Sequence, residues 1–268
     1  MTRRVELLRD LDRANGWVLL VDGVEQSYVD VADARHLEFE YMQHFAVVID
    51  AMLVAPDPVA AVHLGGGALT MPRWLAATRP DSEQVVVEGS PEVLAATRSL
   101  PAVPDCDVVV ADVLPALASL PPGGADLVVW DLYDGPRAVT SALTVEAVQA
   151  MRRLLRPPSG LLTLNVSDAA PFEVVRPVLA ALRACFRDVV LLAEPATLRG
   201  RRSGNCVLAA CVAGQFPGPV LLRAAAGAPT RARVVAGDEL DTFIADARPA
   251  TAQAPLPPPD EASGRGFL

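Results

Sequence analysis

The stretch at residues 60–88 constrains the fold of this chain more than any other. Residues 60–64 form an apolar run that predicts a strand, the three glycines at 65–67 predict a turn, and the residues after them predict a helix. A second β-branched run, residues 84–87, then ends in the carboxylate of Glu88. In a doubly wound sheet, glycines in such a turn let the backbone approach a ligand, and an acid at the end of the next strand accepts bonds from a ribose diol. The stretch therefore predicts a nucleoside-binding site in an α/β fold.

The same alternation of strands and helices continues along the chain. Short β-branched and apolar runs predict seven strands, at residues 59–64, 84–87, 107–110, 127–130, 161–166, 189–193 and 206–212. Strands that alternate with helices of this length favour a mostly parallel sheet that is covered on both faces. A loop rather than a helix joins the last two strands, which favours an antiparallel ending. The predicted fold class is α/β with a Rossmann-like, seven-stranded sheet.

A small β-hairpin is predicted ahead of this sheet. Two β-type runs within residues 17–29 are separated by Asp22-Gly23, a dipeptide that favours a tight turn. Asp33 is expected to cap a helix over residues 34–53, in which apolar side chains recur at helical spacing. The hairpin precedes the main sheet, and Pro56 and Pro58 are expected to end the helix and open the first core strand.

The two ends of the chain carry weaker patterns. Residues 3–13 fit either a short helix or an edge segment. After Gly214, Ala, Pro and Gly dominate, with one helix expected at 238–245 and disorder expected beyond Pro249. We divide the chain into an N-terminal hairpin and helix (1–55), a Rossmann-like catalytic domain (56–214) and a Pro/Ala-rich, partly disordered extension (215–268).

The charge balance limits the classes of function. The net charge is -9 at pH 7, and the 23 basic side chains include no Lys. Nucleic-acid binding needs cations that neutralise phosphates, so the acidic balance argues against it. The lack of lysine excludes Schiff-base and Walker lysine mechanisms. An acidic surface suits a small cationic substrate.

The cysteines and the apolar stretches indicate a cytoplasmic protein without a membrane span. The 4 cysteines form no C-x-x-C pair and no signal peptide is evident, so we expect reduced, buried thiols rather than disulfides or a zinc site. The uncharged stretch 203–222 contains Asn205, Gln215 and two prolines, which favour a strand and a turn over a transmembrane helix.

Acidic residues follow three further predicted strand ends. Glu88 ends the second strand, Asp112 follows the third, and Asp131 and Asp134 follow the fourth. The carboxyl ends of such strands share one crevice. A single acid there is explained as a helix cap, whereas the whole set favours a site. Two carboxylates three residues apart can face a cationic amine together, and one of them can take its proton.

In combination, these residues resemble the spermidine synthase family of polyamine aminopropyltransferases, which has the class I S-adenosylmethionine methyltransferase fold. The resemblance spans about residues 17–212. Motifs at residues 64–71 (L-G-G-G-A-x-T-M) and 200–205 (G-R-R-x-G-N) look closest to an actinobacterial subgroup. The other residues that carry it are Asp22-Gly23-Val24-Glu25-Gln26, Glu40 with His44, Gly65-Gly66-Gly67, Glu88, Asp112 and the D-x-x-D of Asp131 and Asp134.

The resemblance implies a role for each matching residue. Glu88 would hold the ribose hydroxyls, and Asp112 the adenine amine, of decarboxylated S-adenosylmethionine. Asp131 would deprotonate the attacking amine of putrescine, and Asp134 would bind the same cation. The remaining implied residues are Gln26, Gly65, Gly66, Gly67 and Val113 for the cosubstrate, and Tyr133 and Glu40 for the amine. No metal is implied, and a homodimer is expected because the family forms dimers.

The chain departs from the family at positions that affect the choice of reaction. Ala68 stands where the family has an acid, and Glu38 and Phe39 align with a polyamine-binding tyrosine and its neighbour. Without the acid, ordinary S-adenosylmethionine is no longer repelled, and Thr70, Arg73 and the helix N-terminus are expected to attract an anion. Two alternatives stay open: a methyltransferase on the same fold, and a catalytically silent nucleoside-binding relative.

Overall fold

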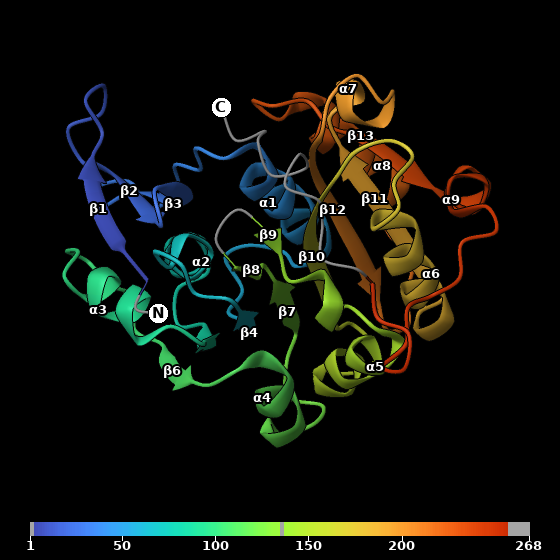
Figure 1. Cartoon of the computed structure of the whole chain (residues 1–268), viewed down its shortest axis with the longest axis horizontal. Coiled ribbons are helices and arrows are strands. Elements are labelled where there is room, and N and C mark those ends of the chain that lie inside the picture. Colours follow the sequence, from blue (N-terminus) through green and yellow to red (C-terminus); the bar gives the residue numbers. More distant parts are fainter. Residues whose placement is uncertain (1–2, 135–136, 257–268) are drawn as a thin grey trace.

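An eight-stranded sheet forms the centre of the computed structural model, which describes residues 3–134 and 137–256 (Figure 1). The strands follow the order β13-β11-β12-β10-β7-β4-β5-β6. Their bounds are β4 Ala60–Leu64, β5 Glu83–Glu88, β6 Asp107–Val110, β7 Leu127–Trp130, β10 Leu161–Asp168, β11 Asp188–Ala193, β12 Gly204–Cys211 and β13 Arg233–Ala236. All seven predicted strands are confirmed, and β13 is an eighth strand at the edge.

The sheet is parallel through its middle and antiparallel at one side. Strands β6, β5, β4, β7 and β10 pair in parallel, whereas β12 pairs antiparallel with β10 and β11, and β13 pairs antiparallel with β11. The predicted antiparallel ending is thus confirmed. The chain moves outward from β4 to β5 and β6, and then returns to β7 on the other side of β4. This reversal is a topological switch point, where open α/β sheets bind their ligands.

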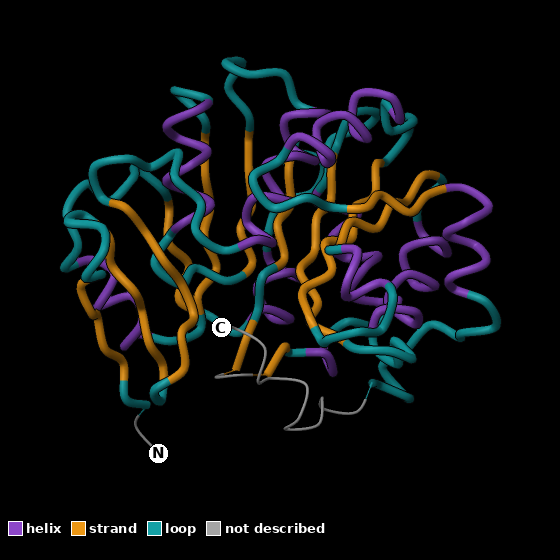
Figure 2. The backbone as a smooth tube through the Cα atoms, turned by 90° about the horizontal axis from the view of Figure 1, so that it is seen from above, coloured by secondary structure: helices purple, strands orange, loops and turns teal. Residues whose placement is uncertain are grey.

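Helices cover both faces of the sheet (Figure 2). One layer contains α4, α5, α6 and α9, and the other contains α1, α2 and α8. Alternate strand residues face opposite layers, so Val62 and Leu64 pack in the first and Ala61 in the second. The helices are α1 Glu40–Met52, α2 Thr70–Thr78, α3 Pro91–Arg98, α4 Val113–Ser119, α5 Val145–Leu154, α6 Val175–Cys185, α7 Pro195–Leu198, α8 Gly218–Gly227 and α9 Gly237–Ile244.

The N-terminal hairpin is confirmed, and a third strand extends it. β1 (Val5–Arg9) pairs antiparallel with β2 (Gly16–Val21), which pairs with β3 (Val24–Asp30). The segment that fitted either a helix or an edge is therefore an edge strand. Leu19 and Val21 of this small sheet form an apolar cluster with residues of the glycine turn and α3. The contact fixes the small sheet beside the carboxyl ends of the central strands.

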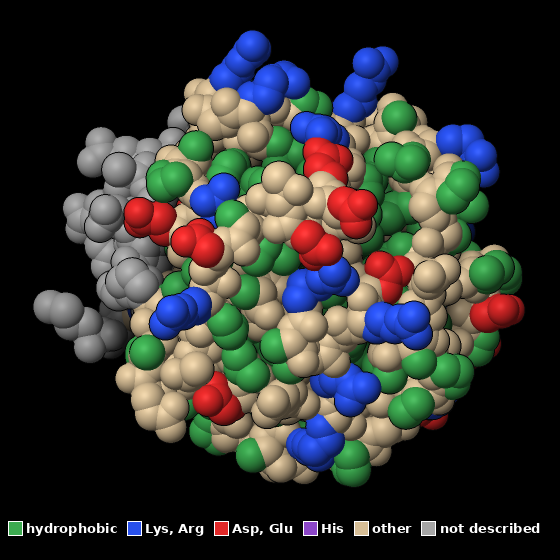
Figure 3. All heavy atoms as spheres, turned by 90° about the vertical axis from the view of Figure 1, so that its right-hand side faces the viewer, with side chains coloured by type: hydrophobic (Ala, Val, Ile, Leu, Met, Phe, Trp, Pro, Cys, Tyr) green, Lys and Arg blue, Asp and Glu red, His purple; other side chains and the backbone are tan. Residues whose placement is uncertain are grey.

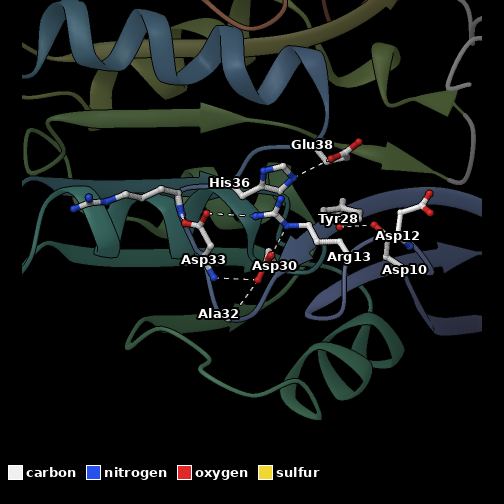
Figure 4. A network of polar contacts seen from close by, with 10 residues as sticks. Asp10, Asp12, Arg13, Tyr28, Asp30, Ala32, Asp33, His36 and Glu38 are labelled. Atoms are coloured by element: carbon white, nitrogen blue, oxygen red, sulfur yellow. Dashed lines mark hydrogen bonds and ion pairs between the residues drawn. The ribbon is translucent and has the colours of Figure 1, made fainter.

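The first helix begins at Glu40, so the prediction that Asp33 caps a helix from residue 34 is wrong. The Asp33 carboxylate accepts a bond from the Arg35 amide (3.2 Å) and forms an ion pair with Arg13 (3.5 Å). Figure 4 shows Arg13 between Asp30 and Asp33, with His36 directed toward Glu38. These tertiary contacts hold residues 31–39 as a connection between the small sheet and α1.

Beyond residue 214 the chain packs against the sheet as α8, β13 and α9. Leu221, Val235 and Leu240 are buried, so this part adds to the core. The helix expected at 238–245 is confirmed as α9, but α8 and β13 were not predicted. The disorder expected beyond Pro249 is wrong as far as Leu256, which is buried. Residues 257–268 lie outside the described part.

The surface combines charges of both signs. On the face that Figure 3 shows, arginines and acidic side chains lie interspersed among apolar and neutral groups. Among residues 3–134 and 137–256, no helix has the length and apolar character that a bilayer crossing requires.

Candidate active site

The glycine turn joins three strand ends at the switch point. The amide of Gly65 donates to the carbonyl of Val87 (2.9 Å), and the amide of Asp131 donates to the carbonyl of Leu64 (2.9 Å). Gly65 has a φ of +103°, and a Cβ there would lie 2.1 Å from the backbone oxygen of Asp131. Only glycine fits at this position, because any side chain would push the turn away from the end of β7.

Backbone amides fix the carboxylate of Glu88. It accepts hydrogen bonds from the amides of Gly66 (3.0 Å), Gly67 (3.3 Å) and Ser90 (2.8 Å). These bonds orient it at the end of β5, on the wall of a depression next to the turn. We name this depression the glycine hollow; its lining also includes Gln26, Thr70, Asp131 and Tyr133.

A second depression, of about 600 Å³, opens from Glu88 toward the end of β6. We name it the strand-end hollow; its lining includes Glu88, Asp112, Val113, Leu114 and Tyr133. Asp112 is the N-cap residue of α4, but its side chain makes no capping bond. The simple explanation of this acid as a helix cap therefore fails. Leu114 is 50% exposed and offers an apolar wall beside the carboxylate.

Asp131 lies between these hollows and the first helix. Its Oδ2 accepts a bond from the hydroxyl of Tyr41 (3.1 Å), and its Oδ1 accepts one from Nδ2 of Asn165 (3.1 Å). Burial raises the pKa of Asp131 to about 6, although both bonds favour the charged form. A carboxylate with this pKa is ionised at pH 7 and more basic than an exposed aspartate.

The two side chains that bond to Asp131 belong to a network that also includes Tyr133 and Asn205. Nδ2 of Asn165 also bonds to the hydroxyl of Tyr133 (3.1 Å), which donates to Oδ1 of Asn205 (3.2 Å). Among the described residues, Oδ1 of Asn165 is buried and has no hydrogen-bond partner. A buried carbonyl oxygen without a donor is unfavourable, so this network has room for one more N–H or O–H group.

A third depression, of about 330 Å³, lies between the small sheet and α1. We name it the acidic hollow, because four carboxylates and one guanidinium line it. Tyr41, which bonds to Asp131, also lines it and connects it to this carboxylate. Its lining residues are Asp10, Val18, Glu25, Tyr28, Glu38, Phe39, Glu40, Tyr41, Arg202, Gly204 and Asn205.

The structure brings most of the predicted site residues to this region. Gln26, Gly65, Gly66, Gly67, Glu88, Asp131 and Tyr133 line the glycine hollow; Asp112 and Val113 line the strand-end hollow; Glu40 lines the acidic hollow. The backbone of Asp134 belongs to the short strand β8 (Tyr133–Asp134), which pairs with β9 (Arg137–Ala138). The Asp134 side chain, for which an amine contact was predicted, lies outside the described part.

Sequence reasoning missed Tyr41, Asn165 and Asn205. Tyr41 fits the apolar spacing of α1, and its ring is indeed in the core, but its hydroxyl reaches Asp131. The resemblance matched Glu38 and Phe39 to a polyamine-binding tyrosine and its neighbour, whereas in the structure a tyrosine contacts Asp131 from residue 41. Asn165 carried a usable signal, because it is a polar residue inside the apolar run of β10.

The predicted attraction of an anion by Arg73 is wrong. Arg73 is 4% exposed and donates to the carbonyls of Ala68 (3.2 Å), Pro101 (3.0 Å) and Ala102 (2.7 Å). The hydroxyl of Thr70 bonds to the carbonyl of Tyr28 (2.9 Å). Ala68 is buried among apolar side chains of the small sheet and α3. Arg73 and Ala68 thus hold the turn together and do not line the glycine hollow, whereas Thr70 lines it with its hydroxyl already bonded.

His63 and His44 both form hydrogen bonds within the protein. His63 is buried and bonds to Gln84 (2.9 Å), and His44 bonds to the carbonyl of Thr230 (3.2 Å). Within the described ranges, no group of three or more His, Cys, Asp or Glu side chains has an arrangement that would hold a metal ion.

Comparison with known proteins gives structural neighbours only. No family model and no curated protein matches the chain. A probable spermidine synthase from Corynebacterium glutamicum superposes with a TM-score of 0.85 at 27% identity, over 93% of each chain. A spermidine synthase in complex with the transition state analogue AdoDATO has a TM-score of 0.59 at 16% identity, over 91% of this chain and 80% of the other. Human methyltransferase-like protein 13 in complex with SAH has a TM-score of 0.54 at 20% identity, over 76% and 89%. The last two likenesses show the fold alone, and they confirm the predicted class.

Proposed function

Because the resemblance to the spermidine synthase family is confirmed over nearly the whole chain, we propose that this protein is a transferase of the aminopropyltransferase type. It would move an aminopropyl group from decarboxylated S-adenosylmethionine to a small polyamine such as putrescine. The observation that carries the proposal is the position of Asp131, between hollows suited to a nucleoside and an acidic hollow suited to an amine.

The strand-end and glycine hollows support a nucleoside sulfonium as the donor. Glu88 is oriented by three amides and has lone pairs left for a ribose diol. The carboxylate of Asp112 makes no capping bond and can accept from an adenine amine. A depression of about 600 Å³ is of the size that holds a nucleoside. The negative charge of Glu88 would also attract the positively charged sulfonium of the donor.

The acidic hollow supports a polyamine as the acceptor. Four carboxylates line it, from Asp10, Glu25, Glu38 and Glu40. Their charges attract a protonated amine and disfavour an anionic or apolar ligand. The apolar side chains Val18 and Phe39 lie between them and suit the methylene groups of a polyamine.

In the proposed reaction, Asp131 accepts a proton from the ammonium group that becomes the nucleophile. The freed nitrogen lone pair attacks the carbon next to the sulfonium. The new C–N bond forms as the C–S bond breaks, and the sulfur keeps the bonding electrons in a neutral thioether. Holding both reactants at Asp131 supplies proximity, and the raised pKa of this carboxyl suits a general base.

Product analysis tests the proposal. The protein is incubated with a panel of polyamines and with either decarboxylated or ordinary S-adenosylmethionine. The products are then identified by mass spectrometry. We expect an aminopropyl adduct of the amine with the decarboxylated donor only. A methylated product would instead establish methyl transfer, for which the structure gives little support, because Thr70 and Arg73 are bonded within the protein.

A further inference from the structure

One arginine, Arg202, lines the acidic hollow together with its four carboxylates. Arg202 lies on the loop between α7 and β12 and forms an ion pair with Glu194. The same nitrogen, Nη2, lies 3.4 Å from a carboxylate oxygen of Glu40. The guanidinium thus lies between two carboxylates that come from different elements.

Those two carboxylates form a cation site with or without Arg202. Burial raises the pKa of Glu40, and the neighbouring charge of Glu194 raises it further. A cation between them relieves this repulsion while both carboxylates stay ionised. In the present structure the cation belongs to the protein, so an ammonium group of a ligand would compete with Arg202 for the same place.

The acidic hollow leads from this cation site to the base. Glu40 and Tyr41 are consecutive residues in the first turn of α1; Glu40 contacts Arg202, and Tyr41 contacts Asp131. The loop that carries Arg202 also carries Asn205, which accepts a bond from Tyr133 next to the base. An extended amine with one end at Asp131 therefore points its other end toward Arg202.

Further carboxylates, from the small sheet and from the segment before α1, also line the hollow. Asp10 accepts a bond from Tyr28 (2.6 Å), and Glu38 bonds to His36 (2.9 Å), as Figure 4 shows. These two acids, with Glu25, remain available to the second ammonium of a short diamine. A third ammonium on a longer amine would reach the guanidinium.

We infer that Arg202 determines acceptor length: it admits a short diamine and disfavours a triamine by occupying the place of the third ammonium. The inference rests on the proposed function and specifies the acceptor class. Its physical basis is repulsion between like charges a few ångströms apart, added to the loss of the Glu40 and Glu194 contacts. An exposed ion pair that only stabilises the loop would not discriminate between amines of different length.

Calorimetric titration of the full chain with putrescine and with spermidine tests the inference. Arg202→Gln keeps a polar side chain but removes the charge, and we expect it to bind spermidine about tenfold more tightly and putrescine within about twofold of the wild type. Arg202→Lys keeps a cation and is expected to retain the wild-type preference. Arg201→Gln, which removes a neighbouring exposed charge, serves as the matched control.

The outcomes separate the inference from the proposed function. An equal change for both amines in Arg202→Gln would overturn the length selection and leave amine transfer in place. The same increase in Arg201→Gln would overturn it as well, since net charge rather than position would be responsible. Failure of wild type and variants to bind either amine would overturn the proposed acceptor class, and the inference with it. Thermal unfolding of each variant checks that it is folded before titration.

Discussion

The glycine turn with Glu88 and the acidic hollow around Glu40 lie on two sides of Asp131, but different interactions hold them. On the turn side, backbone groups fix the geometry. The Gly65 amide bonds to the carbonyl of Val87, and the Glu88 carboxylate accepts a bond from the amide of Gly66. On the acidic side, side chains from the small sheet, α1 and the 200–205 loop meet each other. The turn side is therefore rigid by construction, whereas the acidic side depends on the identity of each side chain.

This difference indicates how strongly binding on each side of Asp131 depends on the identity of single side chains. A site built from backbone groups tolerates changes of side chain, and on this side we propose that it binds a nucleoside. A side-chain-built site is adjusted by single substitutions, and Arg202 among acidic neighbours is such an adjustment. Mutations should accordingly separate donor binding from acceptor binding.

The largest expected effect is on the group where both sides meet. Asp131→Asn removes the base but keeps a side chain of the same shape, so kcat for amine transfer should fall about 1000-fold. Calorimetry should find donor affinity unchanged within about twofold, because Glu88 and Asp112 are untouched. A variant that retained most of its turnover would show that solvent rather than Asp131 takes the proton.

The second largest effect is expected from a substitution in the glycine turn, which should lower stability. Gly65→Ala places a Cβ 2.1 Å from the Asp131 carbonyl at a φ of +103°, and it should lower the free energy of unfolding by about 3 kcal/mol. Gly23→Ala is the matched control: its φ is +80°, but no atom lies within 4 Å of the added Cβ, so a cost of about 1 kcal/mol is expected. Urea denaturation measures both. Equal costs would mean that the turn does not depend on close approach to β7.

The same division explains how far the sequence alone reaches. Strands β4, β5, β6, β7, β10, β11 and β12, the glycine turn and the acids at strand ends follow local patterns, and these were predicted. Tyr41 and Asn165 reach Asp131 only because α1 and β10 are brought together by packing, and helical spacing shows Tyr41 merely as an apolar position. β1 was ambiguous because its few apolar residues fit both a helix and a strand.

Predictions also failed where tertiary contacts overrode local signals. Asp33 has the residue type of a helix cap, but its bonds to Arg13 and to the Arg35 amide hold it in the connection before α1, which begins only at Glu40. β13 is four residues long and lies in the Ala-, Pro- and Gly-rich part of the chain after Gly214, where no strand was predicted. It is ordered because it adds to the edge of a sheet that is already formed.

The smallest expected effect concerns the hydrogen bond that joins the two sides, from Tyr41 to Asp131. This bond stabilises the carboxylate, so Tyr41→Phe should raise the pKa of Asp131 above about 6. A base works only when ionised, and kcat should therefore decline below pH about 6 in the wild type. In the variant the decline should begin about half a unit to one unit higher. Tyr28→Phe is the control, because the phenol that it removes bonds to Asp10 and not to Asp131. In this variant kcat should decline at the same pH as in the wild type. If both variants shift the low-pH decline of kcat by the same amount, the titrating group is not Asp131. A group in the acidic hollow would then control the rate.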